Sequence, residues 1–100
     1  MTKLTNNQKK FLRSMGHTLK PVVMIGQHGL TESVLAELES TMEKHELLKI
    51  KVRAQDRDEK QQMIDQIVKV SRSRLVQVIG NIVVIYRPFD EDPQIILPRK

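Results

Sequence analysis

The feature that most constrains the fold is a run of four apolar residues, Val-Val-Met-Ile at positions 22–25, which leads directly into Gly-Gln-His-Gly at positions 26–29. A continuous apolar run of this length is typical of a strand buried on both faces. Thr31 follows the loop as a candidate helix N-cap. Apolar residues repeat with helical spacing behind it, at Val34, Leu38 and Met42. The order predicts a strand, a tight glycine loop and a helix.

The next segment, Leu-Lys-Ile-Lys-Val-Arg at positions 48–53, alternates strictly between apolar and basic residues. Side chains of a strand point alternately to its two faces, so this segment is predicted to be a strand with one apolar face and one basic face. The basic face consists of Lys49, Lys51 and Arg53.

Capping and turn signals predict the remaining elements. Residues 5–8 fit a capping box for a first helix that ends near Gly16. Asp58 together with Gln61 can cap a third helix. Gly-Asn at positions 80–81 is a two-residue turn of the kind that joins hairpin strands, predicted here at 75–79 and 82–87.

We therefore predict an α/β fold with the element order α-β-α-β-α-β-β. The two strand-helix-strand crossovers favour parallel neighbours, and the hairpin adds an antiparallel pair, which gives one mixed four-stranded sheet packed by three helices. A chain of 100 residues fits a single domain covering residues 1–100.

Positive charge is concentrated at the start of the sequence. The first 31 residues contain five Lys or Arg and no acid, whereas the other residues contain twelve of each sign, so this segment accounts for the whole net charge of +5. Charge gathered on one stretch can attract a polyanion such as RNA. The chain has no cysteine and no long apolar stretch, and we expect a soluble cytoplasmic protein without a membrane segment.

The glycine loop is the first candidate binding site. Gly26 and Gly29 would each permit positive φ and a close approach of a ligand to the main chain, while the start of the following helix favours an anion. Gln27 and His28 could contact a phosphate or a base, or could simply be solvated. The alternative for the whole loop is a tight turn with only a structural role.

Other candidates are the basic side chains. Lys49, Lys51 and Arg53 form a phosphate track if their sheet face is open; alternatively they pair with nearby carboxylates as a solvated face. Those carboxylates are Glu43, Glu46, Asp56 and Asp58. Better candidates are basic residues that have no acid near them in the sequence, namely Lys9, Lys10, Arg13 and Lys20.

Catalytic and metal sites are not indicated. His17, His28 and His45 lack the close spacing of metal ligands. The carboxylates at 56–59 are more simply explained as a helix cap and a match to the helix dipole. The serines have no recognisable nucleophile context. We expect no enzymatic activity, no metal and no cofactor.

Several segments together resemble a known family. They are Gly-His-Thr-Leu-Lys-Pro at 16–21, Val-Val-Met-Ile-Gly-Gln-His-Gly-Leu-Thr-Glu at 22–32, Val-Gln-Val-Ile-Gly at 76–80 and Val-Ile-Tyr-Arg-Pro at 84–88. In this combination the chain resembles the stand-alone bacterial CRM domain, the YhbY-like family of RNA-binding proteins. The resemblance extends from about Leu4 to Pro98.

The resemblance implies a fold similar to the C-terminal domain of bacterial translation initiation factor three. It also implies association with the precursor of the large ribosomal subunit, with RNA contacted by the loop at Gly26, Gln27, His28 and Gly29. We expect a monomer that binds ribosomal RNA. Two alternatives stay open: a module that docks on ribosomal proteins through the basic strand, and an enzyme acting on phosphorylated small molecules at the same loop.

Overall fold

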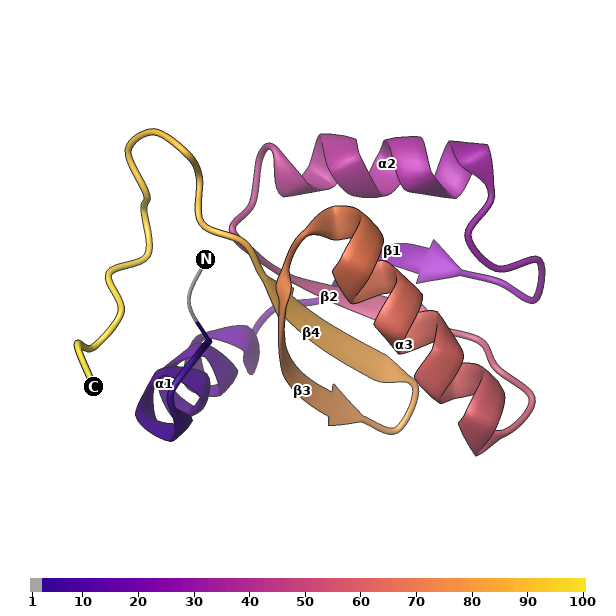
Figure 1. Cartoon of the computed structure of the whole chain (residues 1–100), viewed down its shortest axis with the longest axis horizontal. Coiled ribbons are helices and arrows are strands. Elements are labelled where there is room, and N and C mark those ends of the chain that lie inside the picture. The colour runs from indigo at the N-terminus through magenta and orange to yellow at the C-terminus, as the bar shows by residue number, and fades with distance from the viewer. Residues whose placement is uncertain (1–2) are drawn as a thin grey trace.

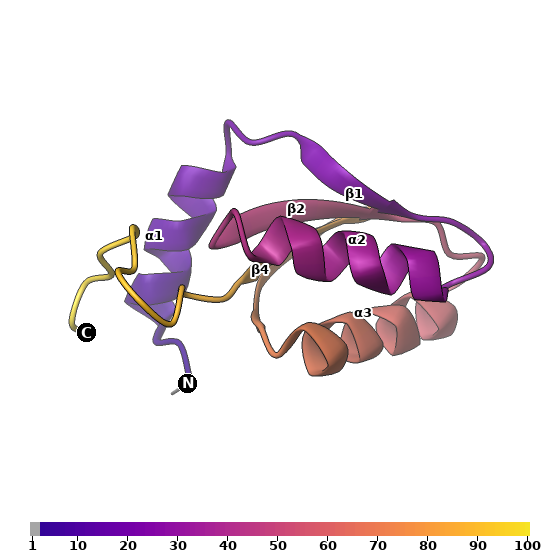
Figure 2. The same ribbon diagram turned by 90° about the horizontal axis from the view of Figure 1, so that it is seen from above.

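The computed structural model describes residues 3–100 and contains three helices and four strands in the predicted order. Their bounds are α1 (Asn6–Gly16), β1 (Pro21–Ile25), α2 (Glu32–Met42), β2 (Leu47–Val52), α3 (Arg57–Ser71), β3 (Arg74–Ile79) and β4 (Ile82–Tyr86). The strands form one sheet, with α2 and α3 side by side on one face and α1 at one end of the other face (Figures 1 and 2).

The sheet is mixed, as expected, but its order is β1-β2-β4-β3. β1 and β2 are parallel neighbours, whereas β4 lies between β2 and β3 and is antiparallel to both. Only the first crossover therefore connects adjacent strands. The second crossover skips one position because β4 folds back from the Gly80-Asn81 turn and occupies the place beside β2.

Helix starts follow the polar residues that can satisfy free backbone N–H groups. Thr5 and Gln8 form the expected capping box of α1, with hydrogen bonds of 3.0 and 3.1 Å. Thr31 accepts a bond from the Val34 N–H at the start of α2. The cap of α3 is Asp56 and not Asp58, because Asp56 accepts the Glu59 N–H at 2.8 Å while Asp58 lies within the first turn.

One apolar cluster lies on each face of the sheet. The larger cluster joins α2 and α3 to the sheet and includes Leu38, Ile50 and Ile67. The smaller one is centred on Leu12 of α1 and includes Val84 and Tyr86. Since α1 is short and covers one end only, the rest of that face is left without a helix (Figure 2).

β1 corrects one expectation from the sequence. Its continuous apolar run predicts burial on both faces, but Val22 is 50% and Met24 64% exposed, while Val23 and Ile25 are buried. β1 is an edge strand, and α1 does not reach its outer face. The apolar side chains at positions 22 and 24 therefore lie on the uncovered part of the sheet.

Candidate nucleic-acid interface

The loop at residues 26–29 is a turn between β1 and α2. The Gly29 N–H donates to the Gly26 carbonyl at 3.0 Å, and the Thr31 N–H donates to the Gly29 carbonyl at 3.1 Å. Gln27 and His28 are exposed at its tip. The turn holds these two residues away from the body of the domain, at the far end of β1 from α1 (Figure 1).

The two glycines of the loop differ in backbone conformation. Gly29 has a φ of 72°, in the left-handed region that favours glycine, whereas the φ of Gly26 is not positive. The freedom of glycine to adopt a positive φ is therefore used at Gly29 and not at Gly26. A Cβ at either position would meet no atom within 4 Å, so the space in front of both is open.

Backbone donors face solvent on both sides of this turn. In the described residues, the N–H groups of Gln27, His28, Glu32 and Ser33 donate no hydrogen bond to the protein. They lie in the loop or in the first turn of α2, where the helix dipole is positive. This end of the molecule can accept an anion, although the negative charge of Glu32 in the same turn weakens the attraction.

The basic face of β2 is largely open. Lys51 and Arg53 are exposed and Lys49 is half-buried, while Ile50 and Val52 point into the core as the alternation predicts. Within residues 3–100, no carboxylate lies within ion-pairing distance of these three cations. The alternative was that these cations pair with Glu43, Glu46, Asp56 or Asp58. The structure contains none of these ion pairs within the described residues.

Arg53 lies one residue past the end of β2 and extends the pairing with β1. Its N–H donates to the Ile25 carbonyl at 2.9 Å, directly before the glycine loop. In the first half of β2, Lys49 lines a groove together with Lys10 and Arg13 of α1. The three strand cations therefore lead from α1 to the loop.

The fold separates the other predicted cations. Lys9 is half-buried on α1 and is not part of the groove, and Lys20 is exposed immediately before β1. Lys20 is close to the loop in sequence but is separated from it by the length of β1, roughly 16 Å for five residues. The open sheet face, which sequence spacing alone did not reveal, connects the two cationic ends.

Glu46 is a buried carboxylate with a structural role. It accepts the backbone N–H groups of Phe89, Gln94 and Ile95 at 2.7–2.8 Å and so fixes the segment after β4. Nothing in the sequence around Glu46 predicted this role, since its partners are more than 40 residues away.

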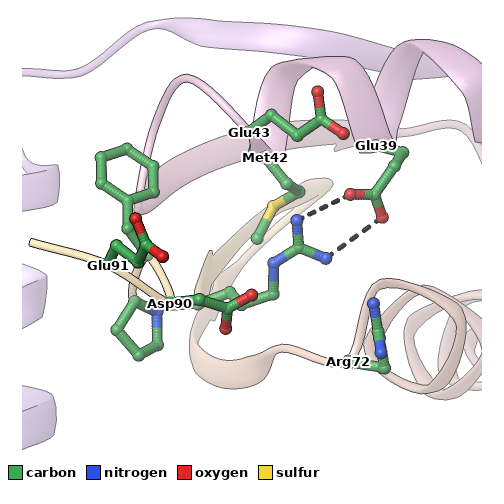
Figure 3. A pocket seen from close by; sticks show the side chains of 9 residues that line it. Glu39, Met42, Glu43, Arg72, Asp90 and Glu91 are labelled. Atoms are coloured by element: carbon green, nitrogen blue, oxygen red, sulfur yellow. Dashed lines mark hydrogen bonds and ion pairs between the residues drawn. The ribbon is translucent and has the colours of Figure 1, made fainter. Parts of the chain in front are cut away.

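A pocket of about 900 Å³ lies between α2 and the segment after β4 (Figure 3). In it Arg87 donates two hydrogen bonds to Glu39, of 2.8 and 3.1 Å, and the contact holds the pKa of that carboxyl below its usual value. Glu43, Asp90 and Glu91 also line this pocket. With this excess of carboxylates the pocket is unsuited to a phosphate.

No cluster of three or more potential metal ligands occurs among the described residues.

Comparison with known proteins identifies relatives over the whole chain. The model of the CRS1 / YhbY (CRM) domain matches residues 4–87. A Haemophilus influenzae protein named "RNA-binding protein" is 51% identical over 100 residues, which is all of both chains. The Bacillus subtilis protein named "Probable RNA-binding protein YqeI" is 39% identical over 95 residues, covering 95% of this chain and 99% of its own.

A solved structure shares the fold. The solution structure of a Staphylococcus aureus protein, described as a candidate RNA-binding protein, superposes with a TM-score of 0.82 at 39% identity and covers 95% of this chain and 99% of its own. No helix among residues 3–100 is long and apolar enough to cross a membrane.

Proposed function

Because this chain belongs to the CRS1 / YhbY (CRM) domain family, we propose that it is a non-catalytic RNA-binding protein that holds the phosphate backbone between α1 and the Gly26–Gly29 loop. The observation that carries the proposal is the open basic face of β2. Lys51 and Arg53 have no ion-pair partner in the described chain, so the field of this face is available to a polyanion.

The names of the relatives support the same partner. Three curated relatives carry RNA binding in their names, and each aligns with at least 84% of this chain. The segments that resemble the stand-alone bacterial CRM domain lead us to propose further that the RNA is ribosomal. The particle would then be the precursor of the large ribosomal subunit in the cytoplasm, bound by a monomer.

The loop can be tested with a pair of matched variants. Gly29→Asp and Gly29→Asn place side chains of similar shape at a positive φ, and both residue types tolerate this conformation better than most. Asp adds a negative charge where a phosphate would bind, so Gly29→Asp should bind ribosomal RNA about ten-fold more weakly than Gly29→Asn, a difference of about 1.4 kcal/mol. Equal affinities would remove the loop from the interface.

The ribosomal target needs a separate experiment. The protein should co-sediment with precursors of the large subunit, and a variant with Lys9, Lys10, Arg13 and Lys20 changed to Gln should dissociate at lower salt. Association that survives RNase treatment and is unaffected by these changes would favour docking on ribosomal proteins. The four exposed or half-buried side chains can be replaced without opening the core.

A further inference from the structure

A groove of about 430 Å³ lies between the second half of α1 and the sheet, and sequence spacing did not predict it. Its residues come from three elements and from the residue after α1: Lys10, Arg13, Ser14, Gly16, His17, Lys49, Gln77 and Ile79. The volume falls within the range of about 300–1,000 Å³ that is typical of small-ligand sites.

The charge of the groove favours an anion. Lys10, Arg13 and Lys49 line it, His17 adds an imidazole, and none of its lining residues is acidic. Within residues 3–100 the three Lys and Arg side chains have no ion-pair partner. A phosphate placed among them would meet cations from two elements, α1 and β2, that are packed against each other.

The opposite wall of the groove is suited to a base. The strand register places Gln77 across from Val84 and Ile79 across from Ile82, on the face where α1 lies. Ile79 is 53% exposed and offers an apolar surface beside the cations. The Gln77 amide can both donate and accept hydrogen bonds, as the edge of a base requires.

We infer that this groove holds one unpaired nucleotide of the bound RNA, with its phosphate on Lys10, Arg13 and Lys49 and its base against Ile79 and Gln77. The inference rests on the proposed RNA binding and deepens it. A base can enter the groove only when it is released from a duplex, so the protein selects RNA with a single-stranded segment at this position.

The rest of the strand would continue along β2 toward the glycine loop. From Lys49 to Arg53 the backbone extends about 13 Å, four strand steps of roughly 3.3 Å. Met24 lies beside Lys51 in the register of β1 and β2, and it is 64% exposed. An exposed apolar side chain thus lies beside the cations on the path between the groove and the loop.

The test uses an introduced fluorophore, because the chain contains no tryptophan. Ile79→Trp places an indole on the base-facing wall, at a position exposed enough to accept it. Its fluorescence should be quenched when a single-stranded oligoribonucleotide binds, and the affinity should rise about five-fold through stacking. Val70→Trp on α3, 46% exposed on the other side of the sheet, is the matched control and should show neither effect.

A second variant and a second RNA complete the experiment. Ile79→Ala should weaken single-strand binding about three-fold and leave the salt dependence unchanged, since it removes no charge. The same sequence closed into a perfect duplex should not quench Ile79→Trp. RNA binding by the wild type without quenching in Ile79→Trp would overturn the nucleotide site and leave the proposed function intact. Failure of the wild type to bind any RNA would overturn both.

Discussion

Arg53 donates its backbone N–H to the carbonyl of Ile25 at 2.9 Å, and this contact brings the last cation of the basic strand next to the residue that precedes the glycine loop. Arg53 is 24 positions beyond Gly29 in the sequence, yet the parallel pairing of β1 and β2 brings the two segments to the same end of the sheet. The loop and the strand cations therefore belong to one surface.

The first prediction concerns the backbone of the loop. Gly29→Ala should lower the free energy of unfolding by about 1 kcal/mol, because an L-residue is strained at a φ of 72°. Gly26→Ala should leave it unchanged or raise it slightly, because position 26 has no positive φ and a Cβ there meets nothing. Urea denaturation of the two variants measures the difference. Equal losses would mean that the turn has another conformation in solution.

The second prediction concerns the buried carboxylate of Glu46. Glu46→Gln turns an amide N–H₂ toward backbone N–H donors that now bond to carboxylate oxygens, and it should cost about 2 kcal/mol of stability. Glu43→Gln, at an exposed position, is the control. Amide exchange should accelerate first at residues 89–95. Unchanged exchange there would show that this carboxylate does not fix the C-terminal segment.

The third prediction concerns pH. The Arg87 guanidinium lowers the pKa of Glu39 in the folded state, so the contribution of this ion pair is complete above the ordinary carboxyl value of 4.5 and is lost as the pH falls through the lowered folded value. Wild type should therefore lose more stability on acidification than Glu39→Gln does. The difference is small because Glu39 is partly exposed.

Glu37→Gln is the matched control for this titration, since Glu37 lies on the same helix, is exposed, and has no ion pair within the described chain. Thermal unfolding followed between neutral pH and pH values below 4.5 gives the comparison. If Glu39→Gln and Glu37→Gln respond to acid alike, the bidentate contact with Arg87 contributes no pH-dependent stability.

The elements of this fold could be predicted because their signals are local. The Thr5 and Thr31 caps, the alternation in β2 and the Gly80-Asn81 turn each depend on residues within a few positions of one another, and the structure confirms all four. Signals of this kind determine where an element begins and which side of it is apolar.

Apart from the cap of α3, which was predicted two residues too late, the errors arise where long-range packing determines which elements lie beside one another. The apolar run of β1 carries no information about which strand or helix will cover it, and its outer face is left open because α1 packs on the other end of the sheet. Likewise, no local pattern shows that β4 will insert between β2 and β3. The groove lined by Lys10, Arg13 and Lys49 depends on the same packing of α1 on the sheet. The sequence therefore identified these residues as cations but could not show that they lie close together.

The last prediction concerns the strand cations themselves. Lys51→Gln and Arg53→Gln should each weaken RNA binding and reduce the slope of log affinity against log salt by about 0.7, the contribution of one neutralised single-strand phosphate. Lys69→Gln is the matched control, because it removes one exposed charge from α3, which covers the opposite face of the sheet.

Removing one charge lowers the non-specific attraction to RNA equally in all three variants. Only a contacted phosphate changes the slope, so binding isotherms across a salt series separate contact from net charge. Parallel slopes for the wild type and all three variants would place the RNA on another surface.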